Sequence, residues 1–324
     1  MKKVWNIGKL ILAMLLLAQA VRWNQRVRSV SEIISVYMEK EGVAVNKARE
    51  ICSQEAERED PCSVCFWKET KDASVSCEET GRSCGVTDIT VVGRADLVVP
   101  ESFSLVWQSE GCFLDTKTAQ ELFGNTSAAG QCVWYQDRKY QVCGTFESGK
   151  KIMIRQAESK NKDSLNRISL KSSDIGSRKE AVSQFLMLYN LSGDEVDLYM
   201  PGALIANLQL LCPLALAVSL ARRVARNKKR NGRILAAAIL IGTLGILWQW
   251  ITIPPEMIPS RWSDFEFWRN CLKEISSSLQ SLFANPLGGV QIDVIFWMLR
   301  STLCSLAAFY LAIISACKIS QTCL

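Results

Sequence analysis

The sequence predicts a membrane protein in which four transmembrane helices carry an α+β extracytoplasmic domain, inserted between the first and second spans. Two observations lead to this fold class. Apolar residues concentrate at the two ends of the 324-residue chain, whereas charge fills residues 22–197. A short basic run between two apolar stretches then orients the chain. Because much of the formal net charge of +6 lies in that run, we interpret it as a topology signal and not as nucleic-acid binding.

Three apolar stretches approach or exceed the length needed to cross a hydrocarbon core of about 30 Å. They are residues 204–221, 234–253 and 294–316. Since none offers a polar face to solvent, we favour spans over buried core helices. The N-terminal stretch has a basic start, an apolar centre and an Ala18-Gln19-Ala20 ending, which suits a cleaved signal peptide. We favour the alternative, a retained anchor over residues 1–24 with Lys9 snorkelling towards the inner surface.

The linker RRVARNKKRNGR, residues 222–233, holds seven basic residues and no acid. A short loop of this kind belongs in the cytoplasm and is our candidate coupling loop. Its basic residues are Arg222, Arg223, Arg226, Lys228, Lys229, Arg230 and Arg233. Residues 25–200 then form the extracytoplasmic domain, and residues 201–324 a three-span membrane domain. The expected location is the plasma membrane, crossed several times.

Eight cysteines fall within the predicted outer domain: Cys52, Cys62, Cys65, Cys77, Cys84, Cys112, Cys132 and Cys143. An even number outside the cytoplasm predicts a disulfide framework. If Asp137-Arg138 forms a two-residue hairpin loop, Cys132 faces Cys143 within disulfide reach. The Cys62-x-x-Cys65 motif has two other interpretations, a redox dithiol and half of a zinc site with Cys77 and Cys84. We favour structural disulfides, because no βαβ pattern surrounds the motif.

Composition also limits the chemistry. The chain has no histidine, which excludes Ser-His-Asp and Cys-His catalysis and every metal site that contains histidine. It also lacks the phosphate-binding G-x-x-x-x-G-K-[ST] motif. We therefore predict no catalytic, cofactor-binding or metal-binding residues in this chain.

Within the outer domain, residues 29–57 have a helical composition and are expected to continue the first span outward as a stalk. Five segments alternate like short strands: residues 88–100, 111–114, 131–136, 140–146 and 150–155. Residues 118–123 predict a short helix stopped by Gly124, and residues 179–193 a helix that leads back to the membrane. Gly144 and Gly149 are expected at turns or bulges.

Residues 263–284 predict an outer amphipathic helix that starts at a Ser263–Glu266 capping box. Its apolar stripe consists of Phe265, Trp268, Leu272, Ile275, Leu279 and Leu282. The helix either lies in the outer-leaflet interface or packs under the outer domain. Within the spans, Asn207, Gln209 and Arg300 mark either helix contacts or a polar path, and Arg300 could also snorkel.

The segment FLDTKTAQELFGNTSAAGQCVWYQDRKYQVCGTFES, residues 113–148, resembles the outer domain of MacB/FtsX-type ABC transporter permeases. In that family a strand leads into a helix ending Leu-Phe-Gly, then a Gly-Gln pair, a hairpin and a closing glycine. The matching residues are Leu122, Phe123, Gly124, Gly130, Gln131 and Gly144. The upstream VVGRADLVVP is a weaker match.

The resemblance implies a non-catalytic permease or mechanotransmission subunit of an export or envelope-remodelling complex. It implies a separate ABC ATPase that uses ATP, a second permease chain and contact with membrane lipid, but no nucleic acid. One departure is the linker at residues 222–233, which is shorter and more basic than the family's ATPase-docking segment. The alternatives are a membrane-anchored binding or regulatory module without ATP coupling, and a thiol oxidoreductase that uses Cys62 and Cys65.

Overall fold

The computed structural model describes residues 2–38, 42–99, 111–158, 164–174, 176–226, 230–254, 257–258, 261, 264–284 and 289–321. The chain divides into two compact units. Unit 1 comprises Met1–Ser31, Leu198–Ser277 and Gln291–Leu324, and unit 2 comprises Glu32–Asp197 and Ser278–Val290. The larger segment of unit 2, Glu32–Asp197, therefore covers most of the predicted outer domain, residues 25–200.

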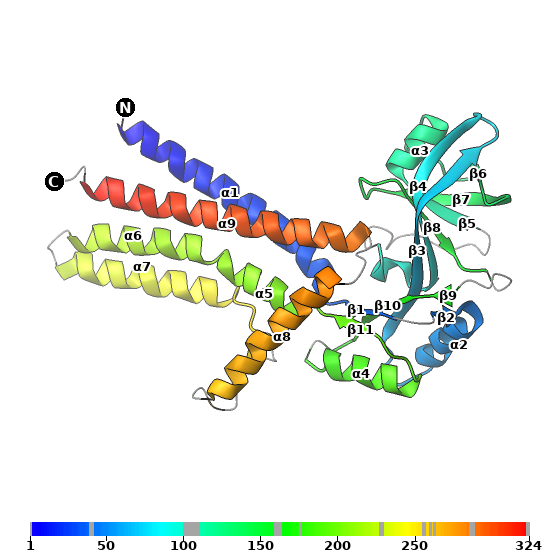
Figure 1. Cartoon of the computed structure of the whole chain (residues 1–324). Helices are drawn as coiled ribbons and strands as arrows, with labels where there is room; N and C mark the ends of the chain where they lie inside the picture. The colour runs from blue at the N-terminus through cyan, green and yellow to red at the C-terminus, as the bar shows by residue number, and fades with distance from the viewer. Residues whose placement is uncertain are drawn as a thin grey trace. The chain divides into compact units, whose positions relative to one another are not determined.

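Unit 2 is built on a nine-stranded sheet with the order β11-β1-β10-β3-β4-β8-β5-β7-β6, and β6 also pairs with β3 (Figure 1). The strands are β1 (Ile34–Tyr37), β3 (Ser63–Cys77), β4 (Arg82–Gly93), β5 (Gly111–Asp115), β6 (Cys132–Tyr135), β7 (Arg138–Phe146), β8 (Ile152–Gln156), β10 (Arg167–Lys171) and β11 (Asp194–Val196). A second sheet pairs β2 (Val43–Ala44) with β9 (Ser164–Leu165). The helices are α2 (Val45–Ala56), η1 (Ala95–Leu97), α3 (Thr116–Phe123) and α4 (Arg178–Leu188).

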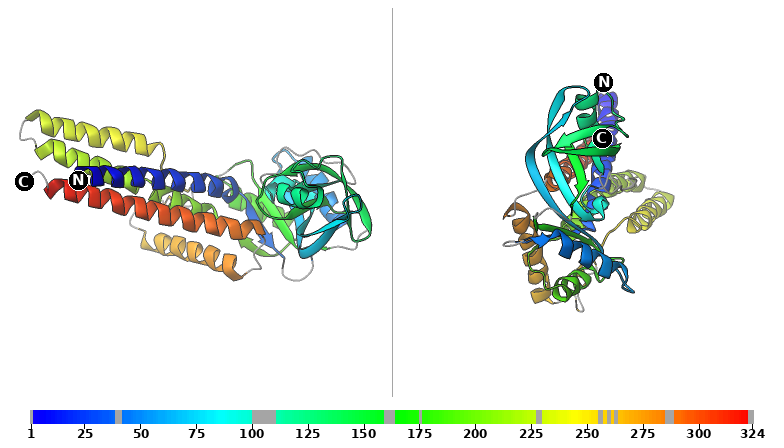
Figure 2. Two further views of the ribbon diagram at one scale, coloured as in Figure 1. Left: turned by 90° about the horizontal axis from the view of Figure 1, so that it is seen from above. Right: turned by 90° about the vertical axis from the view of Figure 1, so that its right-hand side faces the viewer.

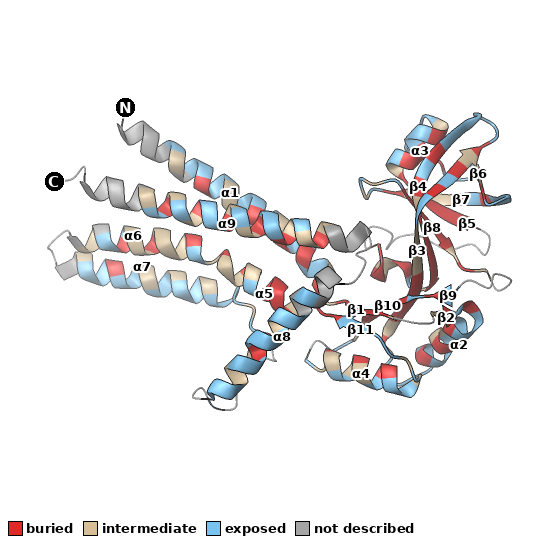
Figure 3. Cartoon of the chain, viewed as in Figure 1, coloured by how far each residue is buried: buried red, intermediate tan, exposed pale blue. Residues whose placement is uncertain are grey.

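The long antiparallel hairpin of β3 and β4 connects the parts of unit 2. Its alternating side chains enter three different apolar clusters: Phe66 packs with α2 and α4, Val75 with α3 and β6, and Trp67 with η1 and β8. Because successive side chains of a strand point to opposite faces, one hairpin can serve clusters on both faces of the sheet. The buried residues accordingly concentrate along this sheet (Figure 3).

The helical stalk predicted for residues 29–57 is wrong. Helix α1 ends at Ser31, strand β1 follows, and a separate helix α2 starts at Val45. The sequence Ile33-Ile34-Ser35-Val36-Tyr37 is rich in β-branched and aromatic residues, which fit a pleated surface better than a helix. Its pairing with β10 and β11 outweighs the helical composition on either side.

The local structure predicted for residues 113–148 is largely confirmed. Asp115 caps α3 by accepting the backbone N–H of Lys117 at 2.8 Å, and Gly124 ends the helix in the left-handed conformation, with φ 75°. The β6–β7 hairpin follows, but its turn is Gln136-Asp137, not Asp137-Arg138. Both turn residues have positive φ, 48° and 61°, as a type I′ turn requires.

The helices of unit 1 are α1 (Lys2–Ser31), α5 (Tyr199–Leu208), α6 (Leu211–Arg226), α7 (Arg230–Trp248), α8 (Phe265–Ala284) as far as Ser277, and α9 (Gly289–Gln321) from Gln291 onward. Two stretches are long and apolar enough to cross a membrane, Tyr199–Arg222 and Asp293–Ile314. Each is only 28% buried, unlike the core helix of a soluble protein. The apolar helix Gly232–Trp248 is shorter. The structure thus supports two of the four predicted spans, those at Tyr199–Arg222 and Asp293–Ile314.

The first of these stretches is broken at Gln209 and Leu210, between α5 and α6. Pro213 explains the break, because its ring displaces the carbonyl four residues earlier, that of Gln209. The Gln209 amide donates to the carbonyl oxygen of Ala20 at 3.0 Å and to the hydroxyl of Ser301 at 2.9 Å. It thereby joins the α5–α6 break to α1 and α9, which run side by side in both Figure 1 and Figure 2.

The other polar residues of the spans also make helix contacts. The Asn207 side chain exchanges two hydrogen bonds with the backbone of Thr252, at 2.8 and 3.0 Å. The Arg300 guanidinium lies 5.0 Å above the ring of Trp23 on α1. Of the two interpretations of these residues, the structure therefore favours helix contacts over a polar path.

Candidate functional site

The chain enters and leaves unit 2 through neighbouring strands. Strand β1 follows α1, strand β11 precedes α5, and the two pair antiparallel with Ser35 opposite Val196. Gly193 permits this approach, because a methyl group there would lie 2.8 Å from the carbonyl carbon of Tyr37. In an antiparallel pair, the start of one strand lies beside the end of the other. The connection from α1 into β1 and the connection from β11 to α5 therefore lie at the same end of this strand pair.

A buried ion pair fastens the exit strand. Arg178, the first residue of α4, donates two hydrogen bonds of 2.6 Å to the two carboxylate oxygens of Asp197. The side chains are 2% and 10% exposed. Such a two-bond pair fixes orientation as well as distance. Since Asp197 is the last residue of this part of unit 2, α4 holds the point where the chain leaves.

Unit 1 contains a matching contact between the helices that continue these strands. Helices α1 and α5 pack together at Gly202, where an added methyl group would meet Ser31 and Val27 at 3.4 Å. Gly202 thus allows close helix approach, as small residues do between membrane helices. The two connections are paired as strands in unit 2 and as helices in unit 1.

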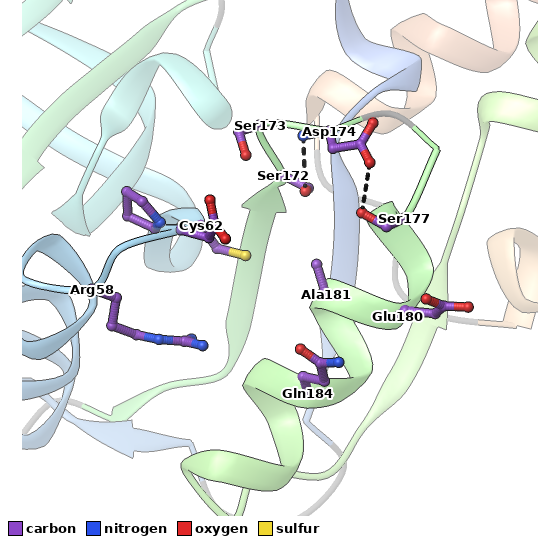
Figure 4. A pocket seen from close by; sticks show the side chains of 11 residues that line it. Arg58, Cys62, Ser172, Ser173, Asp174, Ser177, Glu180, Ala181 and Gln184 are labelled. Carbon is purple, nitrogen blue, oxygen red and sulfur yellow. Dashed lines mark hydrogen bonds between the residues drawn. The ribbon is translucent and has the colours of Figure 1, made fainter.

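A polar cleft of about 410 Å³ lies in unit 2 beside α4 (Figure 4). One wall is the end of α2 and the loop before β3, and the other is the segment between β10 and α4. It is lined by Arg58, Asp60, Pro61, Cys62, Ser172, Ser173, Asp174, Ser177, Glu180, Ala181 and Gln184. Since α4 also carries Arg178, one helix contacts both the cleft and the exit strand.

Glu55 is buried behind one wall of this cleft, with its side chain 1% exposed. It accepts hydrogen bonds from the Arg58 guanidinium at 3.1 Å, the Cys62 N–H at 2.9 Å and the Tyr189 hydroxyl at 3.0 Å. The bond to Glu55 raises the pKa of Arg58. Burial, followed by the bond to Glu55, raises the pKa of Tyr189 to about 12. Glu55 thus balances the charge of Arg58 and ties α2 to α4.

On the opposite wall, Asp174 accepts the Gly176 N–H and the Ser177 hydroxyl, both at 2.9 Å. These bonds lower the pKa of the Asp174 carboxyl. The cleft also exposes the acidic residues Asp60 and Glu180. Its thiol, Cys62, has a pKa raised by burial and then by Glu55, which disfavours the nucleophilic thiolate. These groups suit reversible binding of a polar ligand better than thiol chemistry.

A second charged cluster, which the sequence analysis missed, lies inside the sheet. Arg155 on β8 pairs with Asp88 on β4 at 3.1 Å, with side chains 4% and 0% exposed. The guanidinium also lies 5.2 Å above the ring of Tyr135. Burial raises the pKa of Asp88, although Arg155 opposes that shift. Because the pair joins two parallel strands deep in the sheet, we assign it to the architecture.

The predicted disulfide framework is wrong, since all eight cysteines of unit 2 are free thiols. Cys132 was predicted to face Cys143, but the turn at Gln136-Asp137 places Cys132 opposite Gln141. The β5–β7 register then skips Cys143, because Cys112 lies opposite Val142 and Phe113 opposite Gly144. This bulge confirms the prediction that Gly144 lies at a turn or bulge.

The Cys62-x-x-Cys65 motif precedes and enters strand β3, so its two thiols point to opposite faces. Cys62 belongs to the cluster with α2, whereas Cys65 belongs to the cluster with η1. Cys77 lies opposite Arg82, and Cys84 opposite Val75. Among the residues that the structure describes, no group of three histidine, cysteine, aspartate or glutamate side chains could hold a metal ion. The structure therefore argues against both the dithiol and the zinc interpretations.

The basic linker at residues 222–233 is mostly helical, because α6 extends to Arg226 and α7 begins at Arg230. Arg222 and Arg233 are exposed. Lys228 and Lys229 lie outside the described residues, as do the side chains of Arg223, Arg226 and Arg230.

The residues that carry the family resemblance lie together in unit 2. Leu122 is fully buried, and Phe123 packs on the same cluster. The backbone of Gly130 and Gln131 extends the hairpin through two hydrogen bonds with Val142, both of 2.8 Å.

Comparison with known proteins gives two structural likenesses. The periplasmic region of MacB from Actinobacillus actinomycetemcomitans matches with a TM-score of 0.42 and 10% identity, over 53% of this chain and 91% of that one. The extracellular domain of the noncanonic ABC-type transporter YknZ from Gram-positive bacteria matches with a TM-score of 0.37 and 13% identity, over 50% of this chain and 97% of that one. No family model and no curated protein matches the chain. The chain is thus similar to the periplasmic region of MacB and to the extracellular domain of an ABC-type transporter.

Proposed function

We propose that this chain is a non-catalytic permease or mechanotransmission subunit of an ABC-type export or envelope-remodelling complex. A separate ATPase supplies the energy, and a second permease chain completes the complex. This chain itself binds no cofactor and uses ATP only through that partner. The proposal takes the membrane to be crossed four times, with unit 2 outside the cell.

The observation that carries this proposal is the pairing of the two connections. Strands β1 and β11 are neighbours in unit 2, and α1 and α5 are in contact in unit 1. A displacement of this helix pair acts on two adjacent strands, one of which is fastened to α4 by Arg178 and Asp197. A single strand connection would let unit 2 rotate, whereas two paired strands, one of them held by the Arg178–Asp197 ion pair, transmit torque and force.

The sequence pattern of residues 113–148 supports the same function, because the strand, the helix that ends at Gly124 and the hairpin that follows all adopt the local structure expected from the permease family. A second candidate is a membrane-anchored binding or regulatory module without ATP coupling. The polar cleft beside α4 favours this candidate, as does the shortness of the basic loop.

Purification of the full chain from its native membrane in mild detergent distinguishes the two candidates. We expect an ATPase to be retained, and to be lost when Arg226, Lys228, Lys229 and Arg230 are changed to Glu. The matched control reverses the charge of Arg261, Arg269 and Lys273, which the proposed topology places outside the cell, and should retain the ATPase. A stable complex without any ATPase would instead support the anchored module.

A further inference from the structure

Helix α8 presents large apolar side chains to the surface. Phe265 is 84% exposed and Leu272 is 69% exposed. They are seven residues apart, which is two turns, so they lie on the same face. On the adjoining flank Cys271 is buried, and Trp268 and Ile275 are half-buried. Apolar side chains of this size on one helix face indicate an interaction surface.

The start of α8, which carries Phe265, is fixed by a helix cap. Asp264 caps its start by accepting the N–H groups of Glu266 and Phe267 at 3.1 and 3.0 Å. The cap thus lies one residue after the predicted Ser263, which is outside the described residues. The exposed charged residues of the helix are Glu266, Arg269, Lys273 and Glu274, two acids and two bases. Arg269 is four residues after Phe265 and three before Leu272, so it borders the apolar face. Because these charges cancel, a partner that attaches to α8 gains little from net charge.

The chain itself keeps α8 near the apolar helices. Four residues separate Ala284, the end of α8, from Gly289, the start of α9, and the five residue steps between them span at most about 18 Å. The apolar stretch of α9 begins at Asp293, about one helical turn later. On the other side, α7 ends at the exposed Trp248, and the exposed Trp250 follows two residues later; tryptophan is enriched where membrane meets water.

We propose that α8 is an interfacial helix that lies on the outer leaflet, with Phe265 and Leu272 inserted at the boundary between headgroups and acyl chains. An amphipathic helix tethered beside a span can bury its apolar face there. The proposal rests on the membrane topology of the proposed function. Since the polar face is neutral, attachment depends on apolar burial and not on anionic lipid.

The test uses the full chain reconstituted in phosphatidylcholine nanodiscs that contain nitroxide-labelled lipid. A genetically encoded fluorescent amino acid replaces Leu272 or, as the matched control on the polar face, the exposed Asn270. We expect nitroxide quenching at 272 to be at least threefold stronger than at 270, and to be unchanged in 0.5 M salt. A probe at Phe265 repeats the measurement if the change at 272 disturbs the chain.

A third probe separates the two proposals. Leu303 lies in the apolar stretch of α9 and is 65% exposed, so it should be strongly quenched if that helix crosses the membrane. Quenching at 303 with weak, equal signals at 265, 270 and 272 would overturn the interfacial assignment alone, and would mean that unit 2 or a second copy covers α8. Absence of quenching at 303 would overturn the topology of the proposed function. Loss of the signal at 272 in salt would overturn the argument from apolar burial.

Discussion

Arg178 and Asp197 form an ion pair with two bonds of 2.6 Å, buried where the chain leaves unit 2. The pair joins the first residue of α4 to the residue that follows strand β11. It is a buried pair, so its removal has a different cost from that of a surface pair: loss of one partner leaves an uncompensated charge away from water.

We therefore predict that Arg178→Gln destabilises the exit strand by about 3–5 kcal/mol. The measurement is amide hydrogen exchange of β11 and α4 in the full chain, in which the opening free energy of these segments should fall. Lys179→Gln is the control, because Lys179 lies 3.9 Å from Asp197 and is 35% exposed, so a change of less than about 1 kcal/mol is expected. Equal effects of the two substitutions would contradict the role given to Arg178.

Gly193 provides a second test of the paired connections. A methyl group at this position overlaps the backbone of Tyr37, so Gly193→Ala must push β11 away from β1. We expect faster amide exchange in both strands and a loss of about 1–3 kcal/mol, typical of overpacking. Gly85→Ala on β4 is the matched control, since an added methyl group there meets nothing within 4 Å. If Gly193→Ala exchanged like wild type, the close pairing of β1 and β11 would be wrong.

The region from Asp115 to Gly124 shows what local sequence can predict. The short helix and its terminal Gly124 are determined by residues close in the chain, so their prediction was confirmed without any knowledge of the sheet. The Asp115 cap and the start of the helix at Thr116 were not predicted. The predicted position of the hairpin turn was wrong by one residue, because Gln136 and Asp137 both adopt positive φ although neither is glycine. That shift of one residue was enough to remove the predicted Cys132–Cys143 pair.

Strands β1, β3 and β11 could not be predicted in the same way. Residues 34–37 lie between helix α1 and the short strand β2 that leads into helix α2, and their partners on β10 and β11 lie more than 100 residues away. The cleft depends on the same long-range pairing, because its two walls come from the ends of α2 and β10. Composition located the two apolar stretches that are long enough to cross a membrane, but it gave no information on which strands would be neighbours.

Two phenols predict how unit 2 responds to alkaline pH. Burial is the main cause that raises the pKa of both Tyr135 and Tyr189 to about 12. An ordinary tyrosine has a pKa of about 10, so folding favours the neutral phenol. This stabilisation is fully present below about pH 10 and is lost as the pH rises from about 10 to 12. Absorbance titration of the full chain should show two phenols ionising near pH 12, and one fewer in Tyr135→Phe or Tyr189→Phe.

The comparison for that titration is the same protein in denaturant, where both phenols should ionise near pH 10. If a folded variant, Tyr135→Phe or Tyr189→Phe, shows the same absorbance change near pH 12 as wild type, the substituted tyrosine does not have the raised pKa. The Tyr189→Phe variant has one raised phenol fewer, so its loss of stability between about pH 10 and 12 should be smaller than that of wild type.

The thiol state of unit 2 can be measured directly. We predict that alkylation of the denatured chain without any reductant modifies all eight cysteines, because all eight are free. In the folded chain at neutral pH, Cys65 and Cys112 should react slowest, since burial raises the pKa of both thiols well above the usual range. Peptide mass mapping gives the result for each residue. A peptide that requires reductant before it can be labelled would reveal a disulfide and contradict the structure.

The last prediction concerns Gln209 in unit 1. Its amide bonds two other helices at 2.9–3.0 Å, at the point where Pro213 breaks the apolar stretch. Gln209→Leu should lower the resistance of the full chain to unfolding in detergent by about 0.6–2 kcal/mol, the range of hydrogen bonds between membrane helices. Ser219→Ala is the matched control, because the Ser219 hydroxyl bonds only the carbonyl of Leu216 in its own helix, so no helix contact is lost. If both variants unfolded alike, Gln209 would not join the helices. If Gln209→Leu alone lowered the resistance to unfolding, this amide holds the break between α5 and α6 to α1 and α9.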